Sequence, residues 1–337
     1  MPSSIPIRYS YRKLDGRNTL ATDALEARNQ RPLALSEAAT SYAAGAAAEN
    51  TKRAYSGDWA DFTTWCERNG RESLPADAVT LADYIADMAQ RGYKPSTINR
   101  RCSAIARAHR LAEFPTPLVG VAKETMAGIR RQLGVAPRQV APVTVPDLRI
   151  MCSSQPEDLR GLRDRAILLV GFAGALRRSE LVGLDVVDVK SADAGTVLTL
   201  RRSKTDQEGA GREVAIPYGS HRETCPVRSL QKWLEMAEID EGPIFRPINR
   251  HGTVGLGRLS DRSVALVVQR AAKRIGLDPA MFAGHSLRAG LATAAAAAGV
   301  SEHDIARTTG HRSVAVLRRY VRTSTVFERN AASSVGL

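Results

Sequence analysis

Apolar residues recur at helical spacing soon after an irregular N-terminal segment. Residues 1–34 mix Pro, Ser, Arg and Asn without a sustained period, which predicts a flexible arm. The segment that follows predicts a helix whose apolar face carries Tyr55, Trp59, Phe62 and Trp65. Asn50 can cap this helix, and Asn69-Gly70 can end it.

Two further helices are expected in the same half of the chain. Thr80 and Asp83 form a capping box for a helix over residues 81–89. Pro95 opens the next helix. Its inward face carries Ile98, Cys102 and Ile105 at i, i+4 and i+7. Residues 35–133 are therefore predicted to form an all-helical domain.

The segment 134–146 interrupts this pattern. It contains three prolines and no helical period, so we predict a linker between two domains. Beyond it, helices are expected over residues 158–169 and 178–184, separated by a turn at residues 171–174.

Alternating apolar residues then predict three short strands. They are Val186–Val189, Val197–Arg202 and Glu213–Ile216, and the loop SKTDQEGAG joins the last two. Helices return from Cys225 onward. The second domain is thus expected to be helical with a small inserted sheet.

Helix boundaries are well marked in the C-terminal third. A helix over residues 286–299 is followed by one over residues 301–310, and each ends at a glycine. A last helix begins at Ser313. We assign residues 147–323 to the second domain and residues 324–337 to a C-terminal tail.

The charge balance favours a polyanionic partner. Among 337 residues, 48 Lys and Arg stand against 35 Asp and Glu, which gives a formal net charge of +13. Counterion release from phosphates favours binding by clustered Lys and Arg, so nucleic acid is the first candidate. A basic protein that is merely soluble explains the charge equally well.

Cysteine spacing and hydropathy exclude other classes. The four cysteines form no CxxC pair and no zinc-ligand pattern with His, so we expect a reduced protein without bound metal. No stretch reaches the length of a membrane span, and the N-terminus lacks the apolar core of a signal peptide. A cytoplasmic protein is expected.

Polar residues suited to phosphate chemistry lie in three motifs. These are LRRSELVGL at 176–184, HSLR at 285–288 and GHRSVAVLRRY at 310–320. Arg177 lies at a turn-to-helix junction, with Glu180 one turn on to orient it. His285 and Arg288 share a helix face, so both can reach one phosphate. His311 follows a helix-ending glycine.

Tyr320 is the candidate nucleophile. Val314, Leu317 and Val321 form the apolar stripe of its helix, and Tyr320 lies at the border of that stripe. A tyrosine there can bury a ring edge and present its hydroxyl to a cleft. A packed aromatic residue with a solvated hydroxyl is the alternative.

The order of these residues resembles the signature of the tyrosine recombinases, also called phage-type integrases. The matching positions are Arg177, Glu180, Lys204, His285, Arg288, His311 and Tyr320. The N-terminal half resembles the same family through WCERNG at 65–70 and the basic helix after RGY at 91–93.

The resemblance implies a mostly α-helical, two-domain clamp. A helical core-type DNA-binding domain would precede a catalytic domain with a small antiparallel sheet. Strands would be exchanged through a covalent 3′-phosphotyrosine bond to Tyr320, without metal, ATP or another cofactor. The partner would be double-stranded DNA with inverted repeats, bound by a dimer at one site and a tetramer in the synapse. The tail would dock on a neighbouring subunit, and the protein would associate with the nucleoid.

The family also implies roles for the residues that surround the nucleophile. His285 is the expected base for Tyr320, while Arg177 and Arg288 clamp the scissile phosphate. His311 adds a hydrogen bond to that phosphate.

Two further residues have expected supporting roles. Lys204 lies in the loop between two strands and would protonate the leaving 5′-oxygen, although a solvated loop lysine is the alternative. Glu180 would orient Arg177, and its alternative is a surface ion pair.

DNA contacts are expected from both domains. By resemblance, the helix that begins at Ser96 lies in the major groove. Contacts with phosphates and bases in this domain are expected from Lys52, Arg53, Ser96, Thr97, Arg100 and Arg101. Arg262, after the Ser260 cap of another helix, could read a guanine edge. A solvated basic face is the alternative for each arginine.

Two other functions fit part of the pattern. Residues 294–320 can form a helix-turn-helix, typical of a non-catalytic DNA-binding regulator, but this leaves Arg177, Lys204 and the HSLR motif unexplained. A type IB topoisomerase would share the chemistry but act as a monomer. The sequence leaves open the DNA target, the choice among integration, excision, inversion and multimer resolution, the accessory proteins and the order of strand exchange.

Overall fold

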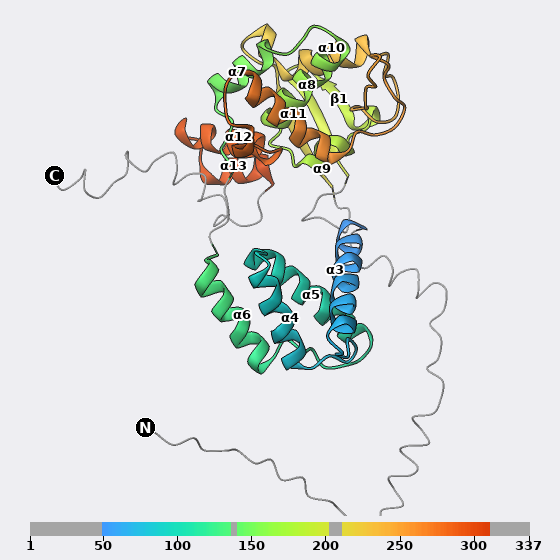
Figure 1. The fold of residues 1–337 in the computed structure, drawn as a ribbon. Helices are drawn as coiled ribbons and strands as arrows, with labels where there is room; N and C mark the ends of the chain where they lie inside the picture. The colour runs from blue at the N-terminus through green and yellow to red at the C-terminus, as the bar shows by residue number, and fades with distance from the viewer. Residues whose placement is uncertain (1–48, 136–139, 202–210, 311–337) are drawn as a thin grey trace, which may run out of the picture. The chain divides into compact units, whose positions relative to one another are not determined.

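The chain divides into two units between Val135 and Ala136, inside the segment predicted as a linker. The structure is a computed structural model that describes residues 49–135, 140–201 and 211–310 (Figure 1). The predicted N-terminal arm and C-terminal tail lie outside the described residues. The fold is mostly helical with a small antiparallel sheet, as the sequence predicts.

The first unit is built from helices alone in its described part (Figure 1). They are α3 (Glu49–Arg68), α4 (Ala78–Gln90), α5 (Pro95–Leu111) and α6 (Gly120–Leu133). Phe62 from α3 and Tyr84 from α4 lie at the centre of its core, with ring centroids 5.0 Å apart. The inward face expected for α5 is confirmed, because Ile98, Cys102 and Ile105 are buried.

The helix starts in this unit differ from the sequence prediction. Asn50 lies inside α3, so it does not cap that helix. Asp77 caps α4 by accepting a hydrogen bond from the backbone N–H of Thr80, which places the start before the predicted box. The prediction omitted α6, whose N-terminus carries no side-chain cap.

The second unit surrounds one central helix. Its helices are α7 (Val145–Ser153), α8 (Leu159–Ala173), α9 (Arg178–Gly183), α10 (Pro226–Met236), α11 (Asp261–Arg274), α12 (His285–Ala297) and α13 (Glu302–Thr309), with 3₁₀ turns at Val186–Asp188, Arg222–Thr224 and Pro279–Met281. The central helix α8 packs against α7, α10, α11 and α12, and Ala166, Ile167 and Leu168 are inaccessible to solvent. Figure 1 shows α8 among these neighbours.

A three-stranded antiparallel sheet completes the second unit. Its strands are β1 (Val189–Ala192), β2 (Gly195–Leu200) and β3 (Arg212–Pro217), in the order β1-β2-β3, with Val197 opposite Ala215. The first predicted strand was misplaced. Residues 186–188 form a 3₁₀ turn, because Asp188 accepts a hydrogen bond from the backbone N–H of Asp185 and closes it.

The end of the predicted linker is part of the second unit. The backbone N–H of Ala141 donates to the carbonyl oxygen of Met281 at 2.8 Å, and that of Val143 donates to Ser286 at 3.0 Å. Val143 is fully buried. A Cβ on Gly290 would lie 2.2 Å from the carbonyl oxygen of Val143, so this segment approaches α12 as closely as glycine permits. Residues 141–143 therefore hold the start of α12.

The four cysteines, which were expected to be reduced, are free thiols, and all four are buried. None of the described helices is long and apolar enough to cross a membrane.

Candidate active site

Arg177 and Glu180 form the first element of the candidate site. The backbone N–H of Arg177 donates to Glu180 Oε2 at 2.8 Å, and its Nη1 donates to Oε1 of the same carboxylate. The Glu180 side chain is fully buried. The expected contact between these residues is therefore present, and it fixes the guanidinium at the start of α9.

Arg288 reaches the same turn from α12. It is only 1% exposed, and its Nη1 donates to the carbonyl oxygen of Ala175 at 2.8 Å. Ala175 lies two residues before Arg177 and has a positive φ of 46°. A side chain and a turn that are distant in the sequence are thus brought together, which gathers two guanidinium groups in one region of the unit.

His285 begins α12 beside α9. A Cβ on Gly284 would lie 2.4 Å from Arg178 Cγ, so glycine allows α12 to start against this arginine. The His285 side chain keeps access to solvent. The protein around the ring and the charges of Arg288, Arg177 and Arg178 lower its pKa below the ordinary value of 6.5. His285 is therefore neutral near pH 7 and able to accept a proton.

Arg212 is a fourth charged group here, and the sequence analysis missed it. Its Nη2 lies 3.7 Å from Glu180 Oε2, and its Nη1 donates to the carbonyl oxygen of Thr308 at 3.1 Å. The strand period contains a signal, since Arg212 alternates with Val214 and Ile216, which are buried. A basic residue on the buried face of a strand marks a functional candidate.

Comparison with known proteins identifies the family of this chain. The model of the phage integrase family matches residues 146–325, and that of the phage integrase N-terminal SAM-like domain matches residues 42–113. The chain belongs to the phage integrase family. The predicted tyrosine recombinase family and enzyme class are confirmed.

Relatives of this recombinase cover most of its length. An integrase/recombinase xerD homolog of Selenomonas ruminantium is 42% identical over 289 residues, 84% of each chain. Recombinase cre of Escherichia phage P1 is 25% identical over 285 residues, which are 77% of this chain and 80% of its own. The Tn1549 transposon integrase, solved with circular intermediate DNA, shares the fold with a TM-score of 0.58 at 18% identity, covering 86% of this chain and 94% of its own.

The other predicted catalytic residues of the recombinase are Lys204, His311 and Tyr320, and they lie outside the described residues. The structure describes the chain up to Gly310, which ends α13 in the left-handed conformation with a φ of 67°, as predicted. The four predicted catalytic residues that the structure describes come from two helix starts: Arg177 and Glu180 from the start of α9, and His285 and Arg288 from the first turn of α12. The structure places them in one unit.

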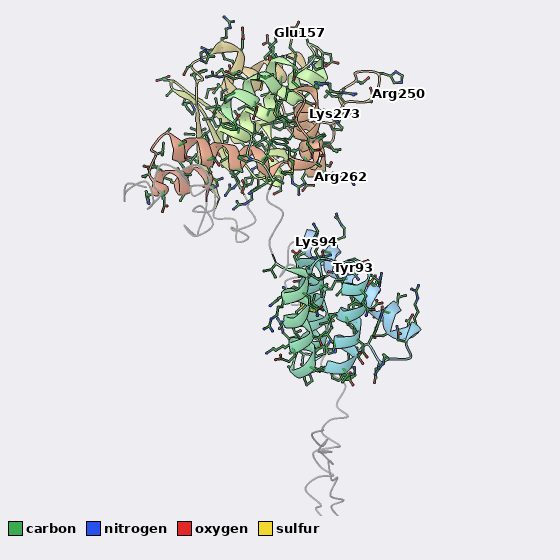
Figure 2. All side chains as sticks on the ribbon, turned by 60° about the vertical axis from the view of Figure 1, so that its left-hand side comes forward. Tyr93, Lys94, Glu157, Arg250, Arg262 and Lys273 are labelled. Atoms are coloured by element: carbon green, nitrogen blue, oxygen red, sulfur yellow. The ribbon has the colours of Figure 1, made fainter. Side chains whose placement is uncertain are left out.

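The predicted DNA-contact residues of the first unit differ in accessibility. Ser96 is exposed at the start of α5 and Thr97 is half-buried. Figure 2 shows Tyr93 and Lys94 next to each other at one end of this unit, where Lys94 immediately precedes α5. On α3, Arg53 is exposed and Lys52 is half-buried. Arg100 is accessible but donates to Asp58 at 2.6 Å.

Arg101 points into the first unit. Its side chain is 11% exposed, its Nη1 contacts Asp61 and lies 2.8 Å from the Tyr84 hydroxyl, and its guanidinium stacks 4.8 Å from the Tyr93 ring centroid. These contacts leave little of the guanidinium for a base or phosphate. The structure thus assigns Arg101 to the packing of α3, α4 and α5 and does not present it as a DNA contact.

Arg262 is accessible in the second unit. It lies in the first turn of α11, whose cap Ser260 accepts a hydrogen bond from the backbone N–H of Ser263. The Arg262 side chain is exposed, and Figure 2 shows it at the opposite end of α11 from Lys273. This position is compatible with the expected base contact.

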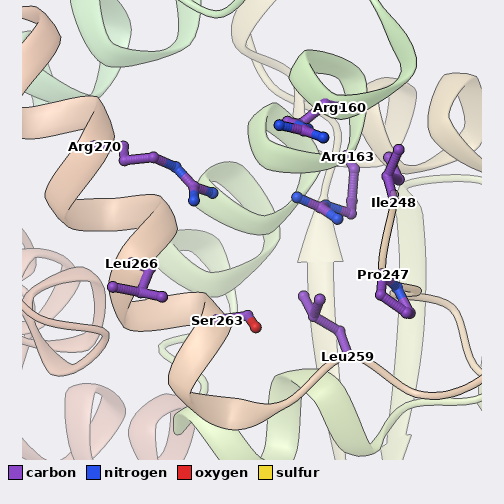
Figure 3. Close-up of a pocket in the computed structure, with 8 residues that line it drawn as sticks. All are labelled: Arg160, Arg163, Pro247, Ile248, Leu259, Ser263, Leu266 and Arg270. Atoms are coloured by element: carbon purple, nitrogen blue, oxygen red, sulfur yellow. The ribbon is translucent and has the colours of Figure 1, made fainter. Parts of the chain in front are cut away.

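A separate pocket of about 210 Å³ between α8 and α11 is lined by three arginines (Figure 3). Arg163 donates to Asp164 at 2.7 Å, and Arg270 donates to the same carboxylate at 3.2 Å. Arg160 donates to the carbonyl oxygen of Asn249. Because each guanidinium already has a protein partner, we assign no ligand to this pocket. No group of three His, Cys, Asp or Glu residues in the described ranges could hold a metal ion.

Proposed function

We propose that this recombinase cuts and rejoins DNA at specific sites through a covalent 3′-phosphotyrosine bond to Tyr320. The supporting observation is the convergence of Arg288 on the turn that precedes Arg177, with the neutral base His285 on the same helix start. Phosphodiester transfer needs such positive charge around the non-bridging oxygens together with a proton acceptor.

The proposed cleavage step exchanges one phosphoester for another. The Tyr320 hydroxyl oxygen bonds to phosphorus as its proton passes to His285, and the bond from phosphorus to the 5′-oxygen breaks. Lys204 gives a proton to this leaving oxygen. Arg177 and Arg288 stabilise the charge of the transition state. Attack by a 5′-hydroxyl reverses the step, so ligation needs no ATP.

We also propose that no metal ion takes part, because the arginines supply the charge that a cation supplies elsewhere. Strand exchange in a chelator such as EDTA tests this proposal. Undiminished rates are expected, and a loss restored by Mg²⁺ would contradict it.

The proposed partner is double-stranded DNA with inverted repeats, bound by a dimer at one site and by a tetramer in the synapse. The net charge of +13 supports a polyanionic partner. The Tn1549 integrase, which shares the fold, was solved in complex with DNA. Docking of residues 324–337 on a neighbouring subunit belongs to the same proposal.

Tyr320→Phe tests the nucleophile. The variant first selects a binding site from a random-sequence duplex library, and that site is then built into a nicked suicide duplex. Wild-type protein should form a denaturant-resistant adduct with the duplex, whereas Tyr320→Phe should bind it without forming one. An adduct in the variant would place the nucleophile elsewhere.

The adduct assay tests one alternative function, and plasmid relaxation tests the other. A non-catalytic regulator would bind without an adduct in either form. A type IB topoisomerase would relax supercoiled plasmid as a monomer without synapsis. The family match favours recombination over both.

A further inference from the structure

Arg212 occupies an unusual position for a charged side chain. It begins β3 on the face of the strand that carries Val214 and Ile216, both of which are buried. Its side chain is 22% exposed. An aliphatic residue would suit the inner face of a sheet better, so the guanidinium has to be explained by its contacts.

These contacts join two parts of the site. Nη2 approaches Glu180 Oε2 at 3.7 Å, on the carboxylate that orients Arg177. Nη1 donates to the carbonyl oxygen of Thr308 at 3.1 Å, in the last turn of α13. Arg212 therefore spans from α9 to the end of α13.

The approach to the end of α13 is close. A Cβ on Gly310 would lie 3.0 Å from both Cζ and Nε of Arg212, tighter than nearly all ordinary contacts. Gly310 is also left-handed, so glycine suits both the turn and the packed guanidinium. The next residue is His311.

The guanidinium of Arg212 stays charged despite its partial burial. Burial lowers the pKa of Arg212. The negative charge of Glu180 raises this pKa, whereas repulsion from the positive charge of Arg177 lowers it further. Arginine nevertheless stays protonated at neutral pH. Among the described residues, neither Nε nor Nη2 has a hydrogen-bond partner. The charge is therefore satisfied only in part by Thr308 and by the ion pair with Glu180.

We propose that Arg212 is a positioning residue for strand cleavage. It fixes the pair formed by Arg177 and Glu180 relative to the last turn of α13. The inference rests on the proposed function, because it assumes that Arg177 acts on the scissile phosphate. Arg212 acts through Glu180 and the Thr308 carbonyl and does not itself touch the DNA.

The test compares Arg212→Leu and Arg212→Lys with wild type on the selected suicide duplex. Leucine fits the strand face but makes neither polar contact. Its adduct formation at saturating DNA should be slower by about 10-fold to 100-fold, the scale expected for a small misplacement of reacting groups. DNA affinity and the thermal unfolding midpoint should be unchanged. Lysine keeps the charge without the planar fork and should recover part of the rate.

Glu213→Gln is the matched control. Glu213 is the neighbouring β3 residue, and its side chain is exposed and pairs with exposed Lys190 at 3.7 Å. Its cleavage rate should equal that of wild type. Arg212→Leu in a Glu180→Gln background should cost less than in wild type, because the shared carboxylate is already lost.

Three outcomes overturn the inference. The first is a wild-type cleavage rate in Arg212→Leu, and the second is a slower rate that is explained by weaker DNA binding. The third is an equal loss of cleavage rate from Arg212→Leu in the wild-type and Glu180→Gln backgrounds. If the leucine variant does not fold, Arg212→Lys decides, since a full rate at saturating DNA would exclude a need for the fork geometry. Failure of wild type to form an adduct would instead refute the proposed function.

Discussion

Arg288 donates a hydrogen bond of 2.8 Å to the backbone carbonyl oxygen of Ala175. This bond joins the first turn of α12 to the turn before Arg177. Arg288 is therefore held by the same segment that positions Arg177, the other residue of the proposed phosphate clamp. A donor group held in place by the protein needs little reorganisation when charge develops on a bound phosphate.

Arg288→Lys should retain DNA binding but cleave slowly. An ammonium group cannot reproduce the planar donor fork that serves both Ala175 and a phosphate. The loss of one transition-state donor predicts a rate about 10²-fold to 10³-fold lower. Adduct formation on the suicide duplex measures the rate, and gel retardation measures binding. Cleavage near the wild-type rate would remove Arg288 from the clamp.

In the plot of cleavage rate against pH, the fall in rate on the acid side should lie below pH 6.5. Partial burial and the nearby arginines lower the pKa of His285 from 6.5, so the neutral base persists as the pH falls through that value and is lost only below it. The rate at limiting DNA reports this pKa of the free enzyme. His285→Gln should cleave slowly and lack this fall in rate. A fall above pH 6.5, or the same fall in the variant, would assign it to another group.

Gly290→Ala should destabilise the second unit by about 1–3 kcal/mol through overpacking. The new Cβ would lie 2.2 Å from the backbone oxygen of Val143 and 2.8 Å from the Phe172 ring. Urea unfolding followed by circular dichroism measures the change.

Gly57→Ala provides the contrast in the first unit. Gly57 lies inside α3, and apart from the adjacent backbone of the same helix no described atom lies within 4 Å of the added Cβ, so the same change should stabilise by about 0.5–1 kcal/mol. Equal effects of the two substitutions would show that the close contact at Val143 carries no cost.

Arg101→Met should act on stability more than on base preference. It removes the cation between Asp58 and Asp61, and Asp58 is only 5% exposed. Breaking a buried ion pair predicts a loss of about 3 kcal/mol. Thermal unfolding and binding to the selected duplex separate the two effects. A stable variant with altered base preference would restore Arg101 as a DNA contact.

Local signals allowed several elements to be predicted. Ser301 caps α13 and a left-handed Gly310 ends it, and both signals lie within the helix or next to it. Arg177 and Glu180 are i and i+3, so their contact follows from helix geometry alone. The order of the motifs was sufficient to indicate the family.

Long-range contacts account for what the sequence could not predict. Arg212 and Thr308 are 96 residues apart, and no periodic pattern links them. The inward turn of Arg101 depends on carboxylates of α3, which the sequence of α5 by itself does not contain. Helix α7 was not predicted, because Pro146 at its start belongs to a proline-rich stretch, although Thr144 caps the helix.

The pairing of Ala141 and Val143 with the loop and helix around α12 bears on how chimeric recombinases should be assembled. A donor DNA-binding unit joined at the first residue of α7 would discard Val143, a fully buried core residue, along with the hydrogen bonds that hold the start of the HSLR helix. The splice point for such exchanges therefore belongs before Ala141, so that each acceptor keeps its own native segment.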